Sequence, residues 1–340
     1  MGLFSRPKST VSSTDIDGGN DGNSNEKPTS KSGAASNSPL PVDAEAPPPA
    51  YSPGPPGATE TSPLTLSDVK RDDDDYYFLS HFDTIFLIDD SSSMSGSRWH
   101  DVQKVLHAIT PICTKHDEDG IDVYFLNHRS EEEPGKKDKH KAKGGYYNIN
   151  SIERIRDIFE PTGRQENYDK RPQPKGCTPT GIRLDDILKP YVKSLKEAQR
   201  AERGPSLLKA MGLKKASNNI KPVNIIVITD GRATVEPKDI IVRHARALDA
   251  LNAASYQVGI QFFQVGNDRE AAEWLRELDD DLAELDVRDM VDTMSWDATA
   301  ADSTKALSAD GILKAVLGGV VRRIDDKRPS NLRDQGMPRK

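Results

Sequence analysis

Two apolar runs in this chain each end in an aspartate. Phe86-Leu87-Ile88 leads into Asp89, and the run Val223–Thr229 leads into Asp230. Such a run is typical of a buried strand that stops and presents polar side chains from the loop at its carboxyl end. In open parallel α/β sheets that end is where ligands bind. The two aspartates are therefore the first candidates for a functional site.

From Tyr76 onward the apolar residues alternate between strand and helix periodicity. The predicted strands are 82–88, 121–126, 146–149, 223–229, 257–265 and 291–294. The predicted helices are 99–115, 152–159, 182–201, 237–253, 269–278 and 312–324. This alternation predicts the α/β class, with a mainly parallel, open, Rossmann-like sheet and helices on both faces.

Composition divides the chain into three parts. Residues 1–75 are rich in Ser, Pro, Gly and Asn and have almost no periodic apolar positions, so they are predicted to be a disordered tail. Residues 76–326 form the predicted domain, and the basic segment 327–340 is a second predicted disordered tail. Within the domain, segments 129–147 and 203–220 are insertions, and the charged stretch 129–143 is expected to be a mobile loop.

The loop after the first predicted strand carries oxygen ligands at alternate positions. Asp89, Ser91 and Ser93 offer one carboxylate and two hydroxyls, a set that suits a hard divalent cation such as Mg2+ or Mn2+. A second loop, Gly176-Cys177-Thr178-Pro179-Thr180-Gly181, opens a helix with a threonine. The alternative is that these hydroxyls only cap a helix and form turns.

Taken together, Asp-x-Ser-x-Ser, the distant threonine and the distant Asp-Gly resemble the von Willebrand factor A (vWA) domain. The resemblance covers about Tyr76–Asp326, and it implies a metal-ion-dependent adhesion site. Its ligands, matched residue by residue, would be Asp89, Ser91, Ser93, Thr178 and Asp230. The family implies a bound Mg2+ or Mn2+ whose missing ligand is a Glu or Asp carboxylate of a partner protein. In family members that switch, partner binding is coupled to sliding of the final helix, here 312–324.

Enzyme motifs are missing from the sequence. Phosphatases of the haloacid dehalogenase type need a second Asp where Ser91 stands, and the chain has no Gly-x-Ser-x-Gly, Walker, Gly-x-Gly-x-x-Gly or His-Glu-x-x-His pattern. We therefore expect a protein–protein interaction module and no enzyme. The alternatives are a structural adaptor whose metal site is silent and, less favoured, a metal-dependent hydrolase.

Charge and cysteine content limit the partners and the compartment. A net charge of −7 gives no reason to expect nucleic acid as a partner. Two cysteines are too few for a disulfide framework, so a reducing, cytoplasmic location is expected. The sequence has no signal peptide pattern and no apolar run of about 20 residues that would predict a transmembrane segment.

The N-terminal tail contains a candidate docking motif. Pro48, Pro49 and Tyr51 form a Pro-Pro-x-Tyr pattern within Ala46–Pro53. Consecutive prolines preset the polyproline II conformation, so docking in an aromatic groove costs little further entropy. The motif predicts a WW-domain partner, which by analogy could be a HECT-type ubiquitin ligase. The alternative is a proline-rich spacer.

Overall fold

A six-stranded sheet carries the fold, with strand order β3-β2-β1-β4-β5-β6. The computed structural model describes residues 63–160, 170–203, 220–285, 287–294 and 308–325, all within one compact unit, Glu60–Lys340. Its strands are β1 (Asp83–Ile88), β2 (Ile121–Phe125), β3 (Tyr146–Ile149), β4 (Val223–Thr229), β5 (Val258–Gln264) and β6 (Val291–Met294). All neighbouring strands pair in parallel except β2 and β3, which are antiparallel.

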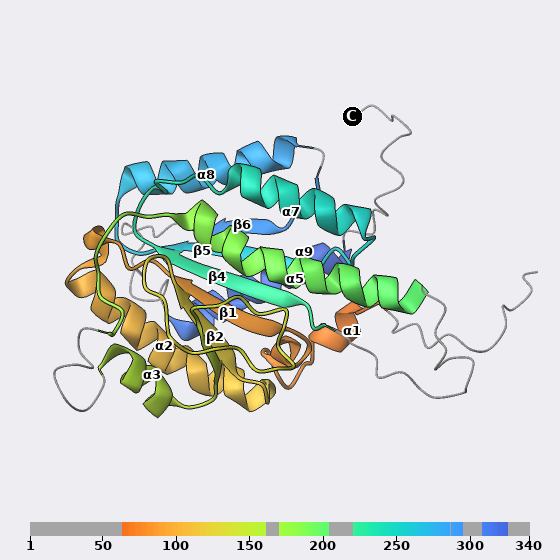
Figure 1. The fold of residues 1–340 in the computed structure, drawn as a ribbon, viewed down its shortest axis with the longest axis horizontal. Coiled ribbons are helices and arrows are strands. Elements are labelled where there is room, and N and C mark those ends of the chain that lie inside the picture. The colour runs from red at the N-terminus through yellow and green to blue at the C-terminus, as the bar shows by residue number, and fades with distance from the viewer. Residues whose placement is uncertain (1–62, 161–169, 204–219, 286, 295–307, 326–340) are drawn as a thin grey trace, which may run out of the picture. The chain divides into compact units, whose positions relative to one another are not determined.

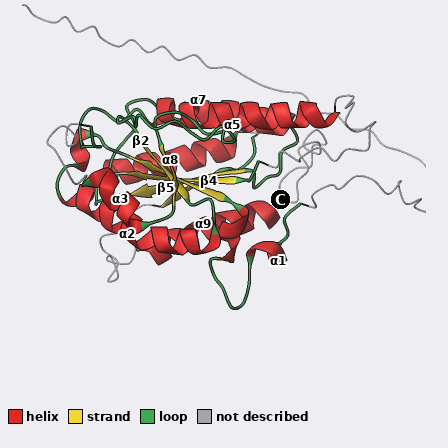
Figure 2. Ribbon diagram, turned by 60° about the horizontal axis from the view of Figure 1, so that its bottom comes forward, coloured by secondary structure: helices red, strands yellow, loops and turns green. Residues whose placement is uncertain are grey.

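Helices cover both faces of this sheet. The longer helices are α2 (Ser97–His116), α3 (Ile152–Phe159), α5 (Thr180–Arg203), α7 (Lys238–Ala250), α8 (Arg269–Glu284) and α9 (Ala309–Asp325). Three short helical segments are α1 (Leu66–Val69), η1 (Tyr77–His81) and η2 (Ser92–Met94). Figure 1 shows α5, α7 and α8 across one face, and Figure 2 shows α2 and α9 on the opposite side of the strands.

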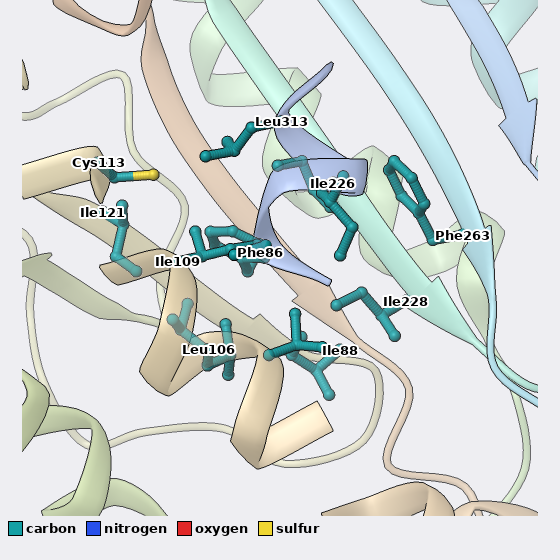
Figure 3. Close-up of a cluster of buried hydrophobic side chains, with 14 of the residues drawn as sticks. Phe86, Ile88, Leu106, Ile109, Cys113, Ile121, Ile226, Ile228, Phe263 and Leu313 are labelled. Carbon is teal, nitrogen blue, oxygen red and sulfur yellow. The ribbon is translucent and has the colours of Figure 1, made fainter. Parts of the chain in front are cut away.

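The sheet divides the apolar core into two clusters because successive strand residues point to opposite faces. Phe86 and Ile88 of β1 face α2 and α9, while Leu87 faces the side of α5, α7 and α8. Both faces are covered, which is why the central strands are continuous apolar runs. Figure 3 shows the first cluster, where Leu106 and Ile109 of α2 meet Phe86, Ile226 and Leu313.

The direction in which strands are added reverses between β1 and β4. From β1 the chain moves outward to β2 and β3, then returns to β4 beside β1 and moves outward in the other direction to β5 and β6. Ile88 and Ile228 are register partners at the carboxyl ends of these two strands. In open α/β sheets such a switch point forms the crevice in which ligands bind.

The predicted α/β class is confirmed, and every predicted strand lies where the structure has one. The helix predicted at 269–278 continues to Glu284 because Leu282 also reaches the core. The helix predicted at 312–324 begins earlier, at Ala309, and buries Leu313 in addition to Ile312, Val316 and Val320.

The packed part of the chain begins earlier than the predicted boundary at residue 76. In α1 the Val69 side chain is fully buried, and a capping box joins Thr65 with Asp68. The Leu64 N–H donates to the hydroxyl of Tyr256, 2.6 Å away. A composition dominated by Pro, Ser and Asp concealed this short apolar contact. Residues 1–62 of the first predicted tail and residues 326–340, which include the whole second predicted tail, lie outside the described residues.

The insertion at 129–143, which we expected to be mobile, is anchored to the domain. Arg183 of α5 is only 1% exposed, and its guanidinium donates to the carbonyls of Phe125, Lys143 and Gly144. Ala142 is buried against the second core cluster. The charged sequence did not reveal this anchor, because the anchoring side chain is itself an arginine from a distant helix. Most of the other insertion, 204–219, lies outside the described residues.

Candidate metal centre

The candidate centre lies where β1 and β4 end side by side. The Asp89 N–H donates to the Ile228 carbonyl, so the pairing of the two strands continues into the loop that holds the first ligand. Asp230 follows β4 directly and is 2% exposed. Two of the predicted ligands thus come from adjacent central strands at the switch point.

Asp89 is fully buried, and both of its carboxylate oxygens accept hydrogen bonds. One oxygen accepts from the Thr229 hydroxyl at 2.6 Å, and the other from the Ser91 N–H at 2.8 Å. Burial raises the pKa of Asp89 to about 6; these hydrogen bonds oppose that rise, and the charge of Asp230 adds to it. A carboxylate held this way is preorganised and costly to keep charged without a nearby cation.

A chain of oxygen atoms links the two loops. The Ser91 and Ser93 hydroxyl oxygens are 3.0 Å apart, and the Ser93 hydroxyl donates to an Asp230 oxygen at 2.8 Å. Octahedral Mg2+ ligands at about 2.1 Å from the ion are about 3 Å apart at neighbouring corners. The spacing of these oxygens therefore fits a small divalent cation.

The loop that carries Thr178 is hydrogen-bonded to the loop that follows β1. The Lys175 N–H donates to the Asp90 carbonyl at 2.7 Å, and the Ser92 N–H donates to the Gly176 carbonyl at 3.2 Å. The Thr178 side chain is nearly buried, and its own carbonyl accepts the N–H groups of Thr180 and Thr234. The structure thus links four predicted ligands through hydrogen bonds and brings the loop of the fifth beside them.

Asp90 and Asn127, which we did not predict, join three of the loops. The buried Asp90 carboxylate accepts from the backbone N–H groups of Asn127 and His128 and from the Asn127 side chain. The same Asn127 amide donates to the Cys177 carbonyl at 2.8 Å. Burial raises the pKa of Asp90. Asn127 comes shortly after β2, which is parallel to β1. Because the carboxyl ends of parallel strands lie together, this position could have been predicted to lie near Asp89 and Asp90.

Arg98 in the first turn of α2 is a third residue that we did not predict from the sequence. Its guanidinium lies 2.5 Å from an Asp230 oxygen and donates to the Ser93 carbonyl at 3.1 Å. The Arg98 side chain is 33% exposed, whereas that of Asp230 is buried. The candidate centre therefore contains a positive charge supplied by the chain itself.

A separate group of carboxylates lies at the amino ends of the strands, at the opposite end from the candidate centre. Asp83, Asp117 and Asp119 place their oxygens within 4.8 Å of one another. The Lys221 ammonium lies 2.8 Å from Asp117, 3.1 Å from Asp119 and 3.8 Å from Asp83. These carboxylates already have a cation, so the cluster is an ion-pair network of the fold.

Fold and site define the class: an α/β protein with a hydrogen-bonded group of oxygen atoms at the switch point of a mostly parallel sheet. No protein-family model matches the chain. None of the curated proteins matches it. Among solved structures, the PilB minor pilin from Streptococcus sanguinis has a TM-score of 0.31 and 11% identity over 72% of this chain. This chain spans 61% of that pilin chain. Similarity at this level identifies neither a function nor a family.

Two further predictions concern the rest of the molecule. Pro48, Pro49 and Tyr51 lie outside the described residues, so the tail motif stays a prediction. Among the described helices, none combines the length and apolar character required to cross a membrane.

Proposed function

We propose that this chain is a metal-dependent protein–protein interaction module of the vWA type. Asp89, Ser91, Ser93, Thr178 and Asp230 would hold Mg2+ or Mn2+. The observation that carries the proposal is the chain of oxygens from Ser91 through Ser93 to Asp230, at ligand-like separations beside the buried Asp89.

The chemistry of the donor set supports a binding role. Only two of the five side chains are carboxylates, so a bound divalent cation keeps affinity for one more anionic oxygen. When bound, the metal supplies a Lewis-acidic position for a Glu or Asp carboxylate of the partner. The chain's own residues fix the ligands: Thr229 and the Ser91 N–H orient Asp89, and Asn127 ties the Cys177–Thr178 peptide to Asp90.

A structural adaptor with a silent metal site is the second candidate. One observation favours it: the Arg98 guanidinium already neutralises Asp230. A metal-dependent hydrolase is less favoured, since the position two residues after Asp89 holds a hydroxyl and no second carboxylate. Binding measurements separate the two main candidates, because only the first requires the metal for partner capture.

The test is capture of partners by the full chain in Mg2+, with and without chelator. Asp89→Ala removes the buried ligand, and Asp101→Ala, on the exposed side of α2, is the matched control. We expect a set of proteins captured by wild type and Asp101→Ala and lost with chelator or with Asp89→Ala. The same set in all four samples would support the silent adaptor.

The N-terminal motif adds a second proposed contact. A peptide covering Ala46–Pro53 should bind a WW domain, and Tyr51→Ala should abolish that binding, since the tyrosine supplies the specific contact. Equal affinity of both peptides would leave the motif as a spacer. With Cys113 buried and Cys177 exposed as free thiols, we also propose a reducing, cytoplasmic setting.

A further inference from the structure

The Arg98 side chain connects two loops of the candidate centre. It lies five residues after Ser93 in the same chain segment, yet its guanidinium contacts Asp230, which follows β4. The same nitrogen also donates to the Ser93 carbonyl. The guanidinium therefore binds between two of the five candidate ligands.

The surroundings of Arg98 leave room for this position. Gly266, just after β5, has a φ of +87°, and a Cβ there would lie 2.9 Å from the Arg98 Nε. A side chain at residue 266 would thus displace the guanidinium. With one third of its side chain exposed, Arg98 also has a path to leave the site toward solvent.

The electrostatics make Arg98 and a divalent cation alternatives. Asp89 and Asp230 are both buried carboxylates, and hydrogen bonds through Ser91 and Ser93 link them. Such a pair of carboxylates needs a positive charge nearby. Either the guanidinium or a divalent cation can supply it, but the two repel each other and use the same Asp230 carboxylate.

We propose that Arg98 is an internal competitor of the divalent cation at Asp230. The guanidinium holds Asp230 while the metal is absent and leaves it when the metal binds. This inference rests on the proposed function and deepens it, because it names a residue that sets the metal concentration at which the module becomes able to bind its partner.

The experiment is calorimetric titration of the full chain with Mn2+, comparing wild type, Arg98→Ala, Arg98→Lys and Arg232→Ala. Arg232 is the matched control, because it is an exposed arginine near Asp230 whose partner is Glu236. We expect Arg98→Ala to bind Mn2+ about tenfold more tightly than wild type. Arg98→Lys should fall between them, since ammonium lacks the planar fork of the guanidinium. Arg232→Ala should match wild type.

Thermal unfolding gives a second readout. Without metal, Arg98→Ala should melt below wild type because Asp230 has lost its cation, and saturating Mn2+ should remove that difference. Equal or weaker Mn2+ binding by both Arg98 variants, with wild type still binding, would overturn the competition and leave the proposed function standing. If neither wild type nor any variant binds Mn2+, the proposed function and this inference both fail. Should Arg98→Ala not fold, Arg98→Lys decides the outcome.

Discussion

Arg323 of α9 donates to the carboxylate of Asp292 on β6, although the arginine side chain is only 2% exposed. The guanidinium enters the protein where two glycines leave space. A Cβ at Gly259 would lie 2.6 Å from an Arg323 nitrogen, and a Cβ at Gly319 would lie 2.4 Å from an Asp292 oxygen. This ion pair, with that of Arg322 to the same carboxylate, ties the last helix to the sheet beside its apolar contacts.

The two adjacent glycines of α9 should respond to alanine in opposite ways. Gly318 is exposed and a Cβ there meets nothing within 4 Å, so Gly318→Ala should stabilise the protein by about 1 kcal/mol through helix propensity. Gly319→Ala forces Asp292 away from Arg323 and should destabilise by about 1–3 kcal/mol. Urea denaturation measures both changes, and equal effects of the two substitutions would contradict the assigned role of Gly319.

The same ion pair bears on whether α9 moves. Breaking a buried pair by removing one partner costs about 3–5 kcal/mol, so Asp292→Ala should lose about that much stability. Asp289→Ala, which removes an exposed carboxylate 3.2 Å from the Arg322 guanidinium, should lose less than about 1 kcal/mol. The hypothesis of a sliding final helix stays a prediction. It requires amide exchange in residues 311–325 to change on partner binding and Ile324→Ala to alter partner affinity.

Thr229 should matter through its hydroxyl. Thr229→Val keeps the shape of this buried side chain but removes the hydrogen bond to Asp89, which should cost about 1.5–3 kcal/mol because the acceptor is charged. Thr229→Ser retains the hydroxyl and is the matched control. Chemical denaturation of the metal-free protein distinguishes them. A valine variant as stable as the serine variant would show that this hydrogen bond is unimportant.

Asp83 should give the protein a measurable pH dependence. Burial raises its pKa to about 7, against the opposing charges of Lys221 and Lys141. The folded state then holds a proton that the unfolded state releases near pH 4, so this contribution to stability is present at low pH and is lost as the pH rises to about 7. Asp83→Asn should be more stable than wild type by about 4 kcal/mol at pH 8, with the difference vanishing near pH 4. A constant difference across this range would contradict the assignment.

The segment 63–75 should contribute to stability. A chain beginning at residue 76 loses the buried Val69, whose burial is worth about 1.5–3 kcal/mol. A chain beginning at residue 63 retains it and is the control. Thermal unfolding of the two should differ by several degrees. Equal midpoints would restore residue 76 as the edge of the folded unit.

The strands could be predicted because burial on both faces makes them continuous apolar runs, as in Val223–Thr229. What the sequence concealed are buried arginines. Arg183 anchors the insertion and Arg323 anchors α9, although charged residues usually lie at the surface. These arginines are buried because distant segments supply the carbonyls and the carboxylate that they bind. The spacing of apolar residues along the sequence does not reveal such partners.

Short-range spacing places Asp89, Ser91 and Ser93 on one loop, so these three candidates follow from the sequence itself, whereas Thr178 and Asp230 were added as ligands by the resemblance to the vWA family. Thr229 was missed because its contact with Asp89 crosses from β4 to the loop after β1, and Arg98 because its contact with Asp230 crosses from α2 to the loop after β4. The register of β1 and β4 brings Thr229 and Asp89 together.

The most direct test of the metal site is Mn2+ titration of wild type beside Thr178→Ala and Asp119→Ala. Thr178 lies on the loop that is hydrogen-bonded to the loop of Asp89, Ser91 and Ser93, and Asp119 belongs to the acidic cluster at the amino ends of the strands. The account predicts one bound ion per chain in wild type and in Asp119→Ala, and binding at least about tenfold weaker in Thr178→Ala. Absence of binding in wild type, equal binding in Thr178→Ala, or loss of binding in Asp119→Ala would contradict it.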